Sequence, residues 1–309
     1  MGRVCVASEH DEVGLLLEQC AGLSVRRGVP GDRCTTFAIG GPIAYLVEPA
    51  DIGSLCTLIS ALHREGFLYR VLGAGSNLLI ADEGISGIVI RLGAGFRTID
   101  QRLGGVFSIG AASSVMRLAR DISAAGFAGL EFAGGIPASL GGAVVMNAGA
   151  HGGEFGDVLE RVGVVLKDGR YEEIERTDLN ISYRRGGIPD GAIVVSAELK
   201  LTSADGAAVA EKRSRFLSHR KETQPLHLPS AGSVFRNPSG HYAGELIERV
   251  GMKGVRFGGA EISSLHANWI VNTSRTATAA EVRHLIDKAV ETVQLQHDVK
   301  LVPEVRIWS

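Results

Sequence analysis

The sequence has few cysteines and no excess of charge. Cys5, Cys20, Cys34 and Cys56 all lie in the first fifth of the 309 residues and form no CxxC pair, so they indicate neither a zinc site nor a disulfide framework. A formal net charge of -2 gives no electrostatic case for a nucleic-acid or membrane partner. No apolar run approaches a membrane span, and residues 1–20 lack the pattern of a secretory signal, so we expect a cytoplasmic protein without a metal site.

Two familiar nucleotide-binding patterns are also absent. Leu78 stands where a GxGxxG fingerprint beginning at Gly73 needs its third glycine, and the residues that follow are apolar and strand-like instead of helical. No GxxxxGK[ST] motif occurs, so a P-loop nucleoside triphosphatase has no support.

What remains is the composition of an ordinary globular protein, 45% hydrophobic and 21% charged, with the length of two domains. Apolar spacing and caps predict helices over about 11–23, 52–65, 114–125, 207–221, 242–250 and 278–296. Strands are predicted over 43–47, 69–72, 87–92, 106–110, 162–166, 171–174, 192–201 and 299–307, with an Asp168-Gly169 hairpin turn. Ser113 is the predicted cap of the third helix. The pattern indicates an α+β chain with a linker near Asp205.

Two stretches are rich in small residues: "VLGAGSNLLIADEG" (71–84) and "GGIPASLGGAVVMNAGAHGG" (134–153). Small residues let several backbone N–H groups converge on one anion without interference from side chains. Either stretch alone is equally consistent with tight turns between strands. Together, with Asn77 and Asn147 among the small residues, they favour a long anionic ligand.

Five stretches in one order carry a family resemblance: "LGAGSNLLI", "GLEFAGGIPASLGGAVVMNAGAHGGE", "ISYRRG", "AGSVFRNP" and "HANWIVN". Over about residues 35–304 the chain resembles the UDP-N-acetylenolpyruvoylglucosamine reductase (MurB) family. The resemblance implies an α+β fold with a two-subdomain, PCMH-type FAD-binding module and a smaller α+β substrate-binding domain. The implied divisions are an N-terminal helical segment (1–30), an FAD-binding domain (31–204) and a substrate-binding domain (205–309).

The resemblance also implies an activity. A monomeric enzyme with FAD as cofactor and NADPH as hydride donor would convert UDP-N-acetyl-enolpyruvoylglucosamine to UDP-N-acetylmuramate, a step of peptidoglycan precursor synthesis. The two small-residue stretches would then lie against FAD. The implied cofactor contacts are Gly73, Ala74, Gly75, Ser76, Asn77 and Leu78 in the first stretch and Gly135, Ile136, Pro137, Ser139, Gly142 and Asn147 in the second.

Three residues match the family's catalytic positions. Arg184 would stabilise negative charge that develops on the substrate carboxylate, Ser233 would donate a proton to carbon, and Glu304 would help to polarise the enol ether. The resemblance assigns substrate binding to Lys221, Arg236, Asn237 and Asn268. His266 is either part of the pocket wall or a packed histidine of the core. Without the resemblance, the commoner readings are a solvated Arg-Arg pair, a turn serine and a surface glutamate.

One departure from the family decides the subtype. The longer class inserts a loop that brings a tyrosine over the nucleotide, whereas "YRRGGIPDGAIVVS" passes directly to the next strand. The chain therefore resembles the shorter class. The alternatives are a flavin-dependent oxidase of the same superfamily and a non-catalytic sugar-nucleotide sensor, which would have lost Arg184, Ser233 or Glu304.

Overall fold

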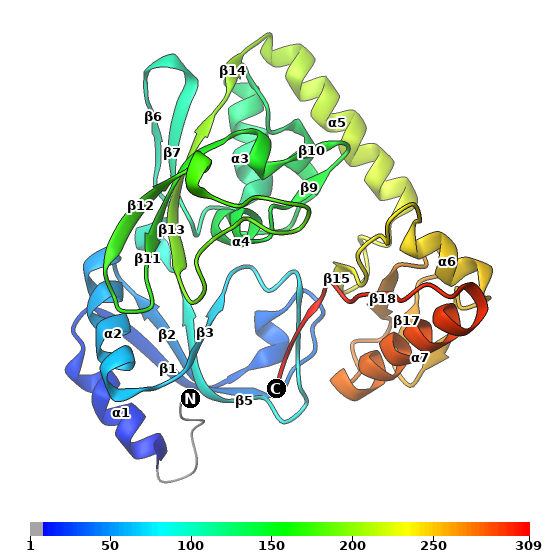
Figure 1. The fold of residues 1–309 in the computed structure, drawn as a ribbon, viewed down its shortest axis with the longest axis horizontal. Coiled ribbons are helices and arrows are strands. Elements are labelled where there is room, and N and C mark those ends of the chain that lie inside the picture. The colour runs from blue at the N-terminus through cyan, green and yellow to red at the C-terminus, as the bar shows by residue number, and fades with distance from the viewer. Residues whose placement is uncertain (1–8) are drawn as a thin grey trace. The chain divides into compact units, whose positions relative to one another are not determined.

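The computed structural model describes residues 9–309, and these separate into two units (Figure 1). Unit 1 contains the chain up to Arg27, then Tyr45–Gly73 and Ser86–Ser218; unit 2 contains Gly28–Ala44, Ala74–Ile85 and His219–Ser309. The chain crosses between them several times, so neither unit is one continuous segment. The division at residues 30 and 204 implied by the family resemblance stays a prediction, and Cys5 lies outside the described residues.

A four-stranded sheet that lies mostly in unit 1 has the order β1 (Leu23–Pro30), β2 (Pro42–Pro49), β5 (Ile85–Arg91), β3 (Tyr69–Leu72), with β3 and β5 parallel. Helix α2 (Ile52–Glu65) follows the prediction: the Asp51 side chain accepts a hydrogen bond from the Ser54 N–H at 2.8 Å, and the helix ends at Gly66. Helix α1 (Glu9–Gln19) ends four residues before the predicted position, because residues from Leu23 onward form the unpredicted strand β1.

A second, antiparallel sheet in unit 1 has the order β12 (Tyr171–Glu175), β11 (Leu159–Val165), β13 (Ile193–Lys200), β7 (Val106–Gly110), β6 (Ile99–Gln101). Helices α3 (Val115–Ala124) and α4 (Leu140–Val145) share a buried core with it that includes Ile109, Leu118 and Val162. The predicted cap of α3 is wrong by one residue, since Ser114 occupies the N-cap position. Short pairs β8 (Phe127–Ala128) with β14 (Thr202–Ser203) and β9 (Gly149–Ala150) with β10 (Gly153–Glu154) complete the unit.

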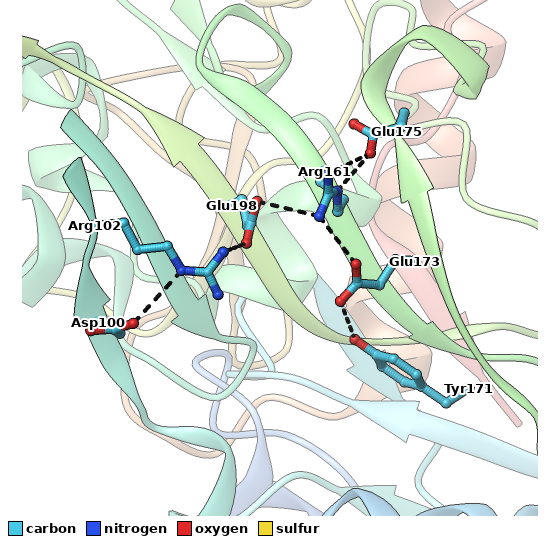
Figure 2. Close-up of polar contacts among 7 residues, drawn as sticks. All are labelled: Asp100, Arg102, Arg161, Tyr171, Glu173, Glu175 and Glu198. Atoms are coloured by element: carbon cyan, nitrogen blue, oxygen red, sulfur yellow. Dashed lines mark hydrogen bonds and ion pairs between the residues drawn. The ribbon is translucent and has the colours of Figure 1, made fainter. Parts of the chain in front are cut away.

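The other face of this sheet carries a network of ion pairs (Figure 2). Side chains alternate along β13, so Glu198 points away from the core that buries Ala197 and Leu199. Glu198 pairs with Arg102 and, at 3.9 Å, with Arg161. From there the network extends to both edges of the sheet through Asp100, Glu173, Glu175 and Tyr171. This part of the face is thus occupied by side chains of alternating charge.

The β11–β12 hairpin forms where the Asp-Gly signal predicts it. The Gly169 N–H donates to the Leu166 carbonyl at 2.9 Å, and the Leu166 N–H donates to the Arg170 carbonyl at 2.8 Å. Gly169 takes a positive φ of 90°, and Asp168 accepts a hydrogen bond from the Arg170 N–H instead. Of the Asp168-Gly169 pair, only Gly169 takes the left-handed conformation.

Unit 2 holds an antiparallel sheet in the order β15 (Ser230–Ser233), β18 (Trp269–Asn272), β17 (Ala260–Ile262), β16 (Arg256–Phe257). Helices α6 (Ala243–Arg249) and α7 (Ala279–His297) share its core, and α5 (Gly206–Thr223) leads into the unit from unit 1 (Figure 1). All three helices were predicted from the sequence, but these four short strands were not.

The predicted C-terminal strand over 299–307 is wrong in most of its length. Only β19 (Arg306–Trp308) is a strand, and it pairs in parallel with β4 (Leu78–Ile80), a strand within the first small-residue stretch. Residues 301–305 instead run beside Phe235, where Pro303 forms an isolated bridge. Among residues 9–309, no helix is both long and apolar enough to span a bilayer.

Candidate functional site

The first small-residue stretch presents bare backbone. A Cβ atom at Gly75, which has a φ of 67°, would lie 2.0 Å from the carbonyl oxygen of Cys34, so no larger residue fits there. The Thr36 N–H donates to the Gly75 carbonyl at 3.1 Å and fixes the bend. Within residues 9–309, no hydrogen bond uses a backbone N–H of residues 73–77 as its donor. These donors are therefore available to a ligand.

The second stretch meets the first at Gly73. A Cβ atom there would lie 2.6 Å from the Ser139 Oγ and 4.0 Å from the Gly142 Cα. Ser139 is the N-cap of α4 and accepts a hydrogen bond from the Gly142 N–H at 3.3 Å. Gly135 and Ile136 are half-buried just before it, and Pro137 is exposed.

These features fit an extended, negatively charged cofactor such as FAD. A pyrophosphate needs several converging donors and a close approach to backbone, and the first stretch offers unused N–H groups at positions with small or absent side chains. The Ser139 hydroxyl lies next to Gly73, where the small residues of that stretch begin. The individual cofactor contacts named from the sequence stay predictions.

The side chains of two predicted cofactor ligands are already engaged within the protein. The Asn77 amide donates to the carbonyl oxygen of Glu304, and the Asn147 amide bonds both Ser182 and Gly156. The neighbouring residues of the two loops can offer a cofactor their backbone atoms and small side chains.

Arg184 lies at the tip of a tight turn in unit 1. Ser182 and Arg185 exchange two backbone hydrogen bonds of 2.9 Å across it, and Arg184 takes a φ of 58°. A non-glycine residue in this conformation costs about 1–3 kcal/mol, which the surrounding contacts must offset. The half-buried guanidinium donates to the Gly149 carbonyl at 3.4 Å and lies 4.8 Å from the Tyr183 ring centroid. Arg184 is thus held in place, whereas Arg185 is exposed.

Ser233 and Glu304 lie together in unit 2. The Glu304 N–H donates to the Val234 carbonyl at 2.7 Å, and the Arg236 N–H donates to the Val302 carbonyl at 3.0 Å. This pairing brings the exposed hydroxyl of Ser233, at the end of β15, beside the segment that carries the half-buried Glu304. Two residues 71 positions apart in the chain thereby share one edge of the unit.

The predicted substrate-binding asparagines also have structural roles. The Asn237 side chain accepts a hydrogen bond from the Ala243 N–H at 3.0 Å at the start of α6. Asn268 is buried and bonds the Phe235 backbone twice, accepting from its N–H at 2.9 Å and donating to its carbonyl at 2.8 Å. Gly244 lies against Asn268, so both asparagines support the first turn of α6.

Three cations in this part of unit 2 have no carboxylate partner among the described residues: Arg220, Lys221 and Arg236. Sequence reasoning missed Arg220, whose only signal was its place next to Lys221. Arg220 is only 9% exposed, burial lowers its pKa, and its Nε–H donates to Gln224 at 2.8 Å. A buried guanidinium without a counter-ion is suited to an anionic ligand.

His266 is held neutral. Burial lowers its pKa, and its Nδ1 accepts a hydrogen bond from the Asn268 N–H at 3.2 Å, which places the ring proton on Nε2. Protonation of Nδ1 would break this bond.

The lowered pKa of His266 predicts a pH-dependent stability. The unfolded chain binds a proton more readily at this residue, so its contribution is complete above the reference pKa of 6.5 and is lost as the pH falls below it. Melting temperatures measured between about pH 5 and 7.5 should show a shallower pH slope for His266→Gln than for the parent, since the variant has no group to titrate. His227→Gln, at an exposed position, is the control. Parallel curves for parent and His266→Gln would contradict the assignment.

Comparison with known proteins finds relatives of one family over nearly the whole chain. Residues 224–308 match the family model described as the UDP-N-acetylenolpyruvoylglucosamine reductase C-terminal domain, and residues 43–175 match an FAD binding domain model. UDP-N-acetylenolpyruvoylglucosamine reductase 2 of Symbiobacterium thermophilum is 42% identical, with 92% of each chain aligned. The reductase of Heliobacterium modesticaldum is 44% identical over 90% of this chain and 88% of its own. The crystal structure of the reductase from Thermus caldophilus is 37% identical and superposes with a TM-score of 0.80, covering 93% of this chain and 100% of that one.

Proposed function

The chain belongs to the UDP-N-acetylenolpyruvoylglucosamine reductase family, and on this premise we propose that it is an FAD-dependent oxidoreductase of peptidoglycan precursor synthesis. Its α+β fold, a PCMH-type FAD-binding module with a smaller substrate-binding part, is the fold of that family. The observation that carries the proposal is sequence identity of about 40% over nearly the full length of both chains, with Ser233 and Glu304 adjacent in unit 2.

The proposed reaction is the reduction of UDP-N-acetyl-enolpyruvoylglucosamine to UDP-N-acetylmuramate with NADPH. Bound FAD would supply the hydride chemistry, accepting hydride from the nicotinamide and delivering it to the vinyl carbon. The backbone N–H groups of residues 73–77, together with Ser139 and the small residues around it, would hold the cofactor. The protein must then supply orientation, charge stabilisation and one proton.

Arg184 is proposed to bind the carboxylate of the enolpyruvyl group. Electron density moves onto this carboxylate as hydride adds to the terminal carbon, so a fixed cation stabilises the transition state more than the ground state. A guanidinium can also orient the carboxylate with two parallel hydrogen bonds. The hydrogen-bonded turn that holds Arg184 supports this role, because charge stabilisation is most effective when the cation does not have to move.

Ser233 is proposed to donate the proton to the adjacent carbon. An ordinary hydroxyl is a weak acid, but the carbon that forms is strongly basic, so a correctly placed serine suffices as general acid. Glu304 would polarise the ether and fix substrate and water next to Ser233. The exposure of Ser233 and the direct pairing of its strand with the Glu304 segment support this division of roles.

The nucleotide end of the substrate is proposed to lie against the unpaired cations of unit 2. Arg220 and Lys221 at the end of α5 would face the diphosphate, while Arg236 and Asn237 would contact the nucleotide. The absence of a carboxylate partner for these cations within residues 9–309 supports an anionic ligand.

The purified protein gives a direct test. It should be yellow, lose its flavin absorbance when NADPH is added without oxygen, and regain it when UDP-N-acetyl-enolpyruvoylglucosamine follows. Turnover with an alcohol and oxygen, without response to the UDP sugar, would favour the oxidase alternative. A colourless protein that binds the UDP sugar would favour the sensor.

A further inference from the structure

Asn77 holds the segment that carries Glu304. Its side-chain Nδ2 donates to the main-chain carbonyl of Glu304 at 3.1 Å, and its own carbonyl accepts from the Arg306 N–H at 3.0 Å. The next residues continue the attachment, since β4 pairs in parallel with β19 from Leu78 and Arg306 onward. Glu304 is therefore bracketed between Asn77 on one side and the Val234 carbonyl on the other.

Asn147 holds the turn that carries Arg184 in the same way. It is only 2% exposed; its Oδ1 accepts from the Gly156 N–H at 2.8 Å, and its Nδ2 donates to the Ser182 carbonyl at 3.1 Å. Ser182 is the residue whose two backbone hydrogen bonds with Arg185 close the turn around Arg184. The Gly186 N–H, bonded to the Val145 carbonyl at 2.9 Å, fixes the turn from its other end.

We propose that Asn77 and Asn147 are positioning residues for the substrate half-reaction, each acting through one catalytic residue, and are not side-chain ligands of the flavin. The proposal rests on the proposed function, which gives Arg184 and Glu304 their roles. Each asparagine lies in a small-residue loop whose backbone is proposed to hold the cofactor. Each loop would then have two uses, with main-chain atoms for the flavin and one side-chain amide for a catalytic residue.

The chemistry of the amides supports this division. A main-chain carbonyl only accepts hydrogen bonds, so at both sites the –NH₂ group must face the segment that it holds. The Asn147 oxygen accepts a hydrogen bond as well, so both ends of this buried side chain are engaged within the protein. Loss of either donor lets the catalytic residue shift from its position. A displacement of about 1 Å can cost about 10²-fold in rate.

The test uses the flavin-loaded protein and four single variants. Asn77→Ala removes one donor, with Asn180→Ala, at an exposed asparagine outside both loops, as its matched control. Asn147→Asp keeps the acceptor for Gly156 and removes the donor to Ser182, and Glu304→Ala removes the partner of Asn77. Readouts are the FAD dissociation constant of the apoprotein, the two half-reaction rates, and amide exchange of residues 301–309.

We expect Asn77→Ala to bind FAD and react with NADPH as the parent does, to respond to the UDP-enolpyruvyl sugar about 10–100-fold more slowly, and to exchange amides of residues 301–309 faster. Asn180→Ala should show none of this. The double variant Asn77→Ala/Glu304→Ala should be no slower than Glu304→Ala, because Asn77 acts through Glu304. Asn147→Asp should slow the same half-reaction while leaving the exchange of residues 301–309 unchanged.

Two results would overturn the inference: an Asn77→Ala protein whose main defect is weaker FAD binding, or rate losses of Asn77→Ala and Glu304→Ala that multiply in the double variant. Failure of the proposed function would look different, because the parent protein itself would then not respond to the UDP-enolpyruvyl sugar. A normal parent with a normal Asn77→Ala variant would leave the function intact and refute the positioning role.

Discussion

Ser233→Ala should slow the substrate half-reaction by about 10²–10⁴-fold, the usual contribution of a positioned general acid, while the reaction with NADPH stays within a few-fold of the parent. The proton that Ser233 is proposed to deliver is needed only after hydride has reached the substrate, so reduction by the nicotinamide does not involve it. Ser233 is exposed at the end of β15, and loss of its hydroxyl leaves no buried group unpaired. The two half-reactions, followed separately by flavin absorbance in a stopped-flow instrument, check the prediction.

Ser230→Ala provides the control because it lies on the same strand and its hydroxyl is assigned no role. Its substrate half-reaction should match that of the parent. If Ser233→Ala slows both half-reactions equally, the residue supports the site in general and is not the proton donor. If it slows neither, another group or a water molecule delivers the proton.

The elements that could be predicted from the sequence are those fixed by neighbouring residues. Helix α2 begins at Asp51 and ends at Gly66 because both caps are local, and its apolar face is visible at helical spacing. Strands β15 to β18 are two to four residues long, too short for a period-2 pattern, and are strands only because they pair with one another. The predicted C-terminal strand failed for the same reason. Val299, Leu301 and Val305 pack in the core of unit 2, but only Arg306–Trp308 finds a strand to pair with.

The candidate site shows the same limit. Ser233, Glu304 and Arg184 were named from motif positions, whereas the hydrogen bonds that hold them join residues far apart in the chain, such as Asn77 with Glu304. A lone asparagine among glycines resembles a ligand in sequence, and only the fold reveals which carbonyl it faces. Arg220 was missed because an Arg-Lys pair in a helix normally lies in solvent, and its burial depends on tertiary packing.

Arg184→Lys should cost about 10²-fold or more in the substrate half-reaction, even though the charge is kept. A guanidinium offers a carboxylate two parallel donors in a fixed plane, and a lysine ammonium offers a single point charge on a flexible stem. Lysine would also lose the contacts that hold the arginine, namely the hydrogen bond to the Gly149 carbonyl and the packing over Tyr183. Because the left-handed backbone of residue 184 is strained for both side chains, the substitution changes the side chain and adds no new backbone penalty.

The neighbouring Arg185 supplies the matched control. It is exposed, sits in the same turn and carries the same charge, so Arg185→Lys should leave both half-reactions unchanged. Rates at saturating UDP-enolpyruvyl sugar separate the two ways in which Arg184 can act. If its role is to stabilise charge that develops in the transition state, the maximal rate falls more than the apparent substrate affinity; a loss confined to affinity would reduce Arg184 to a binding residue. Equal effects of the two substitutions would mean that the turn contributes only its overall positive charge, and the assignment of Arg184 would fail.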